Sequence, residues 1–202
     1  MARVEIAGGI ASGKTTLAGL LGVRRFSAVL EDFQTNPFLK AFYADPIGTA
    51  FETEITFLLQ HYHDIKLARR SQSGFVCDFS LVLDLAYAHV TLSESKLAVF
   101  QQVLQEIRSE IPPPDLLIHL ICDPNVELAR IRRRGREVEN AITVDYLAEL
   151  NHALQVQVQG SGIKNVLVID SAVRNFADDE SVRAAVNAEV VERIATDVPR
   201  DV

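Results

Sequence analysis

The chain has 202 residues, 48% of them hydrophobic, and a formal net charge of −7. This length and composition predict one domain over residues 1–202 with a substantial core, and the negative charge argues against binding of polymeric nucleic acid. No stretch approaches the ~20 apolar residues of a membrane span, and the two cysteines do not suggest a disulfide scaffold, so we expect a cytoplasmic protein without membrane contacts.

The first predicted element is a short strand that leads into a glycine-rich loop. Val4 to Ala7 alternates apolar and polar residues, and a helix-like run begins at Thr16. The loop between them matches G-x-x-x-x-G-K-[ST] in full and comprises Gly8, Gly9, Ile10, Ala11, Ser12, Gly13, Lys14 and Thr15. In such a loop, backbone N–H groups and Lys14 hold phosphates, while the Thr15 hydroxyl can bind Mg²⁺. We therefore predict a nucleoside triphosphate site that includes Thr16.

Four more apolar runs alternate with longer helical patterns, which indicates βαβ units and a parallel sheet. Strands are predicted at 28–30, 75–77, 116–121 and 166–169, and helices at 50–70, 94–110, 125–134 and 143–157. The carboxyl ends of parallel strands share one edge, so Glu31, Asp78 and Asp123 should converge near the phosphates. Carboxylates there can accept a hydroxyl proton or hold a metal ion. Asp78 could instead cap the helix that begins near Ser80.

A basic run stands out in this acidic chain and comprises Arg130, Arg132, Arg133, Arg134 and Arg136. Taken alone, it indicates a solvated helix end, where cations meet the helix dipole favourably. Combined with a phosphate-binding loop and the Gly135 interruption, it favours a mobile lid that folds guanidinium groups over transferring phosphates.

The order of these motifs resembles that of the deoxynucleoside kinase family over nearly the whole chain. The resemblance rests on the glycine-rich loop, Asn36-Pro37-Phe38-Leu39, Phe42-Tyr43-Ala44-Asp45, Asp78-Phe79-Ser80 with Asp84, Pro113-Pro114-Asp115-Leu116, and Arg130 to Arg136 with Glu139. It implies an α/β fold of the P-loop kinase type: a doubly wound, five-stranded parallel sheet flanked by helices, with an arginine-rich lid. It also implies a homodimer that uses ATP and Mg²⁺ to phosphorylate a deoxynucleoside 5′-hydroxyl in nucleotide salvage.

The resemblance implies roles only where residues match. Glu31 is similar to the base that accepts the 5′-hydroxyl proton, and Tyr43 with Glu139 is similar to the pair that holds the sugar 3′-hydroxyl. Asp78 and Thr15 would lie near Mg²⁺, Asp84 near the nucleoside, and Lys14, Arg130, Arg134 and Arg136 near the phosphates, with Arg134 or Arg136 stabilising charge during transfer. Tyr43 could instead belong to the core, and Glu139 could pair with a lid arginine without touching ligand.

Three positions depart from the pattern that the family usually shows. Phe79 stands where arginine is frequent, Glu54 where glutamine reads the base edge, and His61 where arginine is usual. An ionised glutamate only accepts hydrogen bonds, and guanine offers two adjacent donors, so Glu54 favours deoxyguanosine or another purine. A protonated Glu54, beside the apolar Phe57 and Leu58, or a Glu54 paired with charged His61 would restore other bases, and a modified nucleoside is a further alternative.

Two other function classes remain open at this point. A different P-loop small-molecule kinase would share the loop and the arginine lid, and a substrate panel would separate it. A regulatory module that binds nucleotide without catalysis would account for the altered Glu54 and His61, but the intact Lys14, Thr15 and Glu31 argue against it.

Overall fold

The computed structural model describes residues 1–23, 26–71 and 73–196. Within these ranges a five-stranded parallel sheet has the order β2-β3-β1-β4-β5. Its strands are β1 (Arg3–Gly8), β2 (Ser27–Val29), β3 (Phe75–Cys77), β4 (Leu116–Ile121) and β5 (Val166–Asp170). The order reverses at β1, which confirms the doubly wound parallel sheet predicted from the sequence. The second strand begins one residue earlier than predicted.

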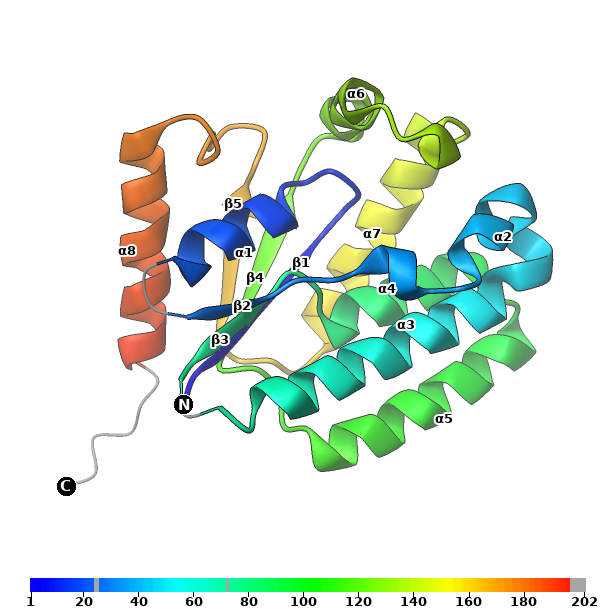
Figure 1. The fold of residues 1–202 in the computed structure, drawn as a ribbon, viewed down its shortest axis with the longest axis horizontal. Helices are drawn as coiled ribbons and strands as arrows, with labels where there is room; N and C mark the ends of the chain where they lie inside the picture. Colours follow the sequence, from blue (N-terminus) through cyan, green and yellow to red (C-terminus); the bar gives the residue numbers. More distant parts are fainter. Residues whose placement is uncertain (24–25, 72, 197–202) are drawn as a thin grey trace.

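Helices cover both faces of the sheet (Figure 1). One face carries α1 (Lys14–Gly22) and α8 (Glu180–Thr196), and the other carries α3 (Pro46–Ala68), α4 (Leu81–Thr91), α5 (Glu94–Glu110) and α7 (Val144–Gly160). At the carboxyl edge of the sheet lie α2 (Leu39–Ala44), α6 (Pro124–Arg134) and the short 3₁₀ turns at Phe33–Thr35 and Glu137–Glu139. No helix among the described residues is long and apolar enough to cross a membrane.

The period-2 alternation of β1 divides the core between the two faces. Val4 and Ile6 pack with α1 and α8, whereas Ala7 packs with residues of α4 and α7. A separate cluster joins Phe75 of β3 to α3, α4 and α5. Burial on both faces is expected for a parallel sheet covered by helices, and it fixes the register that sets the strand ends at one edge.

Local signals explain the helix boundaries. Asp45 accepts the Gly48 N–H at 3.0 Å and precedes Pro46, so α3 begins four residues before the predicted start, where proline is favoured. Gly135, with φ of 67°, ends α6 at Arg134 as predicted. The short helix α2 was not predicted, since its six residues carry no apolar periodicity. Both cysteines are free thiols; Cys77 is buried and Cys122 is half-buried.

Candidate active site

The glycine-rich loop connects β1 directly to α1. Gly13 adopts φ of 105° and Ala11 φ of 61°, so the chain turns sharply before Lys14 starts the helix. The Lys14 Nζ donates to the carbonyls of Gly8 and Gly9 at 3.0 Å each. Residues 10–16, which include the end of the loop and the amino end of α1, line one cavity, and a loop of this kind at a helix amino end is suited to bind phosphate anions.

One cavity of about 1390 Å³ opens at this edge and gathers most of the residues that the sequence singles out. Its volume exceeds the roughly 300–1,000 Å³ of single-ligand sites, which suits two ligands side by side. Site residues that line it are Ile10, Ala11, Ser12, Gly13, Lys14, Thr15, Thr16, Glu31, Tyr43, Glu54, His61, Asp78, Asp84, Arg130, Arg134, Arg136 and Glu139. Gly8 and Gly9 contribute through their carbonyls to Lys14.

Glu31 and Asp78 follow neighbouring strands and meet beside the loop. The Glu31 N–H donates to Asp78 Oδ1 at 2.7 Å. Burial raises the pKa of Asp78, while the neighbouring Thr15 hydroxyl, the Glu31 N–H and the charge of Lys14 oppose the shift. The alternative role of Asp78 as a helix cap is wrong, because Ser80 accepts the Leu83 N–H at 3.1 Å and caps α4.

Lys14 completes this polar group. Burial lowers the pKa of Lys14, and the charges of Glu31 and Asp78 raise it. Burial is the larger effect, so the net shift of the Lys14 pKa is downward.

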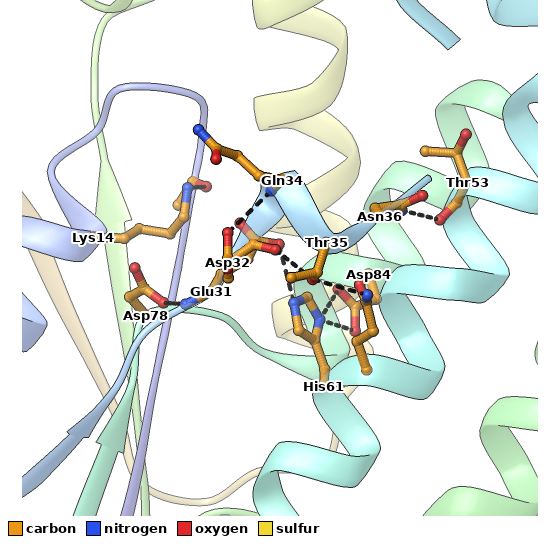
Figure 2. Close-up of polar contacts among 12 residues, drawn as sticks. Lys14, Glu31, Asp32, Gln34, Thr35, Asn36, Thr53, His61, Asp78 and Asp84 are labelled. Atoms are coloured by element: carbon orange, nitrogen blue, oxygen red, sulfur yellow. Dashed lines mark hydrogen bonds and ion pairs between the residues drawn. The ribbon is translucent and has the colours of Figure 1, made fainter. Parts of the chain in front are cut away.

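His61 lies between two carboxylates deep in the cavity (Figure 2). Its Nδ1 is 2.9 Å from Asp84 Oδ1, and its Nε2 is 3.0 Å from Glu31 Oε1. Burial disfavours the charged imidazole, but Asp84 and Glu31 outweigh it and raise the pKa of His61 to about 10. Burial likewise opposes ionisation of Glu31, and His61 and Lys14 bring the pKa of Glu31 below its ordinary value.

Glu54 also lines the cavity, from a position on α3 about two turns before His61. It is 5% exposed and accepts a hydrogen bond from the Thr91 hydroxyl at 3.2 Å. Burial and the charge of Asp84 raise the pKa of Glu54 to about 8. The carboxyl group therefore carries a proton over much of the neutral range, which was one of the alternatives weighed from the sequence. His61 is committed to Asp84 and Glu31 rather than to Glu54.

Arg130 has different partners from the two arginines that approach Glu139, which are Arg134 and Arg136. Arg130 donates through Nη2 to the Ser171 carbonyl at 2.7 Å and through Nη1 to the Ala11 carbonyl at 3.3 Å. Arg134 forms an ion pair with Glu139. Arg136 stacks on the Phe33 ring, with the guanidinium carbon 4.3 Å from the ring centre.

Tyr43 lies near Glu139, Arg134 and Arg136. Burial, together with the charge of Glu139, raises the pKa of Tyr43 to about 12, so the phenol stays protonated and available as a hydrogen-bond donor. The cavity lining thus favours a ligand-facing Tyr43 over the core alternative.

Sequence reasoning missed two parts of the cavity wall. Tyr87 of α4 and Tyr146 of α7 line it, and so do residues 171–172 and 174–178 after β5. The second set was detectable, because β5 ends at the same edge as the other parallel strands. The tyrosines were not, since their helical positions are indistinguishable from core positions in the sequence.

Thr15 and Asp78 suit a magnesium ion that is held mainly by a substrate. A hydroxyl and a carboxylate are hard oxygen donors, and Mg²⁺ commonly takes one or two protein oxygens together with phosphates and waters. The described residues contain no cluster of three histidine, cysteine or acidic side chains that would form a closed metal site. The donor set therefore fits a nucleotide-bound Mg²⁺.

The chain is similar to known deoxynucleoside kinases along nearly its whole length. Residues 4–195 match the family model "Deoxynucleoside kinase". The chain is 26% identical to a deoxyguanosine kinase of Bacillus subtilis, covering 95% of this chain and 97% of the relative. It is 30% identical to a deoxyadenosine kinase of Dictyostelium discoideum, covering 92% and 78%. The structure of deoxyadenosine kinase from M. mycoides with bound dCTP superposes with a TM-score of 0.80 at 18% identity, covering 94% of this chain and 99% of that chain.

Proposed function

The chain belongs to the deoxynucleoside kinase family, and on this premise we propose that it transfers the ATP γ-phosphate to the 5′-hydroxyl of a purine deoxynucleoside, with Glu31 as the base. The observation that carries this proposal is the meeting of Glu31 with the phosphate loop in one cavity large enough for both substrates. Glu31 is ionised at neutral pH because His61 and Lys14 lower its pKa.

In the proposed reaction, the O5′ oxygen forms a bond to the γ-phosphorus while the bond to the β,γ-bridging oxygen breaks. The 5′-hydroxyl proton passes to Glu31, and ADP leaves with the electron pair of the broken bond. Phosphoryl transfer needs mainly positioning and countercharge. Lys14 supplies positive charge at the phosphates, and Arg134 and Arg136 supply it from the lid side of the cavity. Bound Mg²⁺, held by Thr15 and Asp78, would add charge neutralisation at the phosphates.

We assign the nucleoside to the side of the cavity that contains the tyrosines. Tyr43 and Glu139 would hold the 3′-hydroxyl, because a protonated phenol and a carboxylate together offer a donor and an acceptor. Glu54 would meet the base edge from α3. When Glu54 is ionised, guanine fits best; when it is protonated, it offers one donor and one acceptor, as adenine and also cytosine require. The names of the similar kinases, which include deoxyguanosine and deoxyadenosine, support a purine substrate.

The test is ATP-dependent phosphorylation of the four deoxynucleosides by the purified chain. We expect the highest kcat/KM with a purine deoxynucleoside, and we expect Glu31→Gln to lower kcat by about 100- to 10,000-fold, as loss of a general base does. ATP binding should survive in the Glu31→Gln protein, since Glu31 lies outside the glycine-rich loop. Turnover led by thymidine or deoxycytidine would contradict the purine assignment, and an active Glu31→Gln variant would remove Glu31 as the base.

The resemblance also supports a homodimer in the cytoplasm as part of this proposal. The free thiols of Cys77 and Cys122 are consistent with a reducing compartment. The molar mass in solution, measured by light scattering at several concentrations, tests the dimer.

A further inference from the structure

The contacts of His61 set it apart from the other residues around the cavity. Both ring nitrogens are used: Nδ1 lies 2.9 and 3.0 Å from the two oxygens of Asp84, and Nε2 lies 3.0 Å from Glu31 Oε1. The ring also stacks on Phe79, with centroids 4.0 Å apart and planes 5° from parallel. His61 belongs to α3, Asp84 to α4 and Glu31 to the segment after β2, so the His61 side chain links three separate segments of the chain (Figure 2).

These contacts define the chemical state of the ring. A neutral imidazole has a single N–H donor, whereas both nitrogens of His61 face carboxylate oxygens, an arrangement that requires two donors. The ionisable groups around it are Asp84 on α4, Glu31 after β2, Glu54 on α3 and Glu5 on β1, all of them acidic. His61 is therefore an imidazolium that donates twice, and it is unsuited to accept the substrate proton itself.

Resting on the function proposed above, we propose that His61 is a positioning residue that fixes Oε1 of Glu31 and leaves Oε2 for the 5′-hydroxyl proton. The other donor of His61, Nδ1, anchors the ring to Asp84 on the wall of the proposed nucleoside pocket. The Glu31 carboxylate is therefore held in position relative to that pocket rather than by the segment that carries Glu31.

The surroundings of Glu31 explain why such a support is needed. The Glu31 side chain is 34% exposed, and its own main chain is tied to Asp78 by one hydrogen bond. Without His61, rotation about the side-chain bonds would let the carboxylate turn toward water. His61 has no such freedom, because its side chain is 4% exposed and the ring lies against Phe79, with Phe57 stacked 5.9 Å away. Displacement of a reacting group by about 1 Å can cost ~100-fold in rate.

Two substitutions separate the two contacts of the ring. Asparagine places its amide near the position of Nδ1, so His61→Asn keeps a donor for Asp84 and loses the contact with Glu31. Glutamine reaches the position of Nε2, so His61→Gln keeps a donor for Glu31. We expect His61→Asn to lower kcat about 100-fold with KM for the nucleoside changed less than about threefold, and His61→Gln to recover at least about tenfold of that loss. A role in folding alone would lower the active fraction in both variants alike, so kcat is normalised to the ATP-binding fraction.

A double-mutant cycle completes the test. In the Glu31→Gln background, His61→Asn should cost no further kcat, because residues that act as a unit are not additive. His63→Asn, an exposed histidine two residues along α3, is the matched control and should match the parent. Equal losses from His61→Asn in both backgrounds, or a parental kcat for His61→Asn, would overturn the inference while the kinase function stands. A parent protein that phosphorylates no deoxynucleoside would overturn the proposed function and this inference together.

Discussion

Arg134 and Glu139 form a two-point ion pair, in which Nε donates to Oε2 at 2.7 Å and Nη2 donates to Oε1 at 2.6 Å. Glu139 is 4% exposed, and Arg136 approaches the same oxygen, Oε1, at 3.5 Å. The pair joins a residue proposed for phosphate contact to one proposed for sugar contact, so the lid and the nucleoside pocket share a charge pair. This agrees with the expectation that Glu139 could pair with a lid arginine, and it leaves the proposed sugar contact to be tested.

Replacement of Glu139 tests the sugar contact. We expect Glu139→Ala to abolish the preference for a 2′-deoxynucleoside over its 2′,3′-dideoxy analogue, because a hydrogen bond to a charged group contributes about 1.5–3 kcal/mol. The measurement is the ratio of kcat/KM for the two substrates, which should fall by roughly 10- to 100-fold. Glu137→Ala, two residues away and exposed, should keep the parental ratio. An unchanged ratio in Glu139→Ala would assign Glu139 to the lid alone.

The base preference should depend on pH through Glu54, whose pKa is raised to about 8 by burial and the charge of Asp84. Below that pH, Glu54 is protonated and can pair with adenine; above it, the carboxylate only accepts and suits guanine. The ratio of kcat/KM for deoxyguanosine to that for deoxyadenosine should therefore rise as pH rises through the pKa. The neighbouring ionisable groups are Asp84, His61, Glu31, Tyr87 and Tyr146.

Glu54→Gln is the matched test of that pH dependence, because the amide cannot ionise. In Glu54→Gln, the ratio of the two kcat/KM values should no longer change with pH. Glu52→Gln, a change at an exposed position two residues before Glu54 on α3, should keep the parental profile. A ratio is used because any common effect of pH on transfer cancels. If the parental ratio is already flat across about one pH unit on each side of the Glu54 pKa, Glu54 does not select the base by protonation.

Gly9 should tolerate no side chain. A Cβ at Gly9 would collide with Glu127 Oε1 and Asn151 Oδ1, which come from α6 and α7. Overpacking of this kind costs about 1–3 kcal/mol, so Gly9→Ala should lower the free energy of unfolding and weaken ATP binding. Gly19→Ala is the control, because a Cβ there would meet no described atom within 4 Å beyond its chain neighbours and the nearby backbone of its own helix, and alanine favours a helix. Urea unfolding and ATP titration measure both effects, and an unaltered Gly9→Ala protein would show that the ends of the Glu127 and Asn151 side chains turn aside.

Arg130 should affect the phosphate donor more than the nucleoside. Its guanidinium links the glycine-rich loop at Ala11 to the segment after β5 at Ser171. We expect Arg130→Met to raise KM for ATP by about tenfold, consistent with the loss of a charge-assisted hydrogen bond, and to leave KM for the nucleoside unchanged. Arg132→Met, exposed on the same helix, provides the comparison. A matched rise in both KM values would indicate a general disturbance of the cavity.

Several features of this protein follow from residues that are close in sequence. The geometry of the loop from Gly8 to Thr15 depends on residues within the loop itself, namely on the conformations that its glycines allow and on the amino end of the helix that follows. The strand positions and the end of α6 at Gly135 were likewise predictable from apolar runs and a left-handed glycine. Covered parallel strands then place Glu31 and Asp78 at one edge.

By itself, the sequence determined the phosphate loop, the parallel sheet and many of the residues that meet in the cavity, because these depend on local patterns and on one rule of sheet topology. It placed Asp123 there wrongly, since Asp123 accepts the Asn125 N–H at 2.8 Å at the start of α6 and does not line the cavity. Only the tertiary structure decided which of the cavity residues pair. Asp84 and His61 are 23 residues apart and Glu31 and His61 are 30 apart, and their contacts depend on how α3 packs against α4 and the end of β2. The charge of His61 and the proton on Glu54 were decided there as well, because burial and the nearest charge fix a pKa, and neither is encoded in a local run of residues.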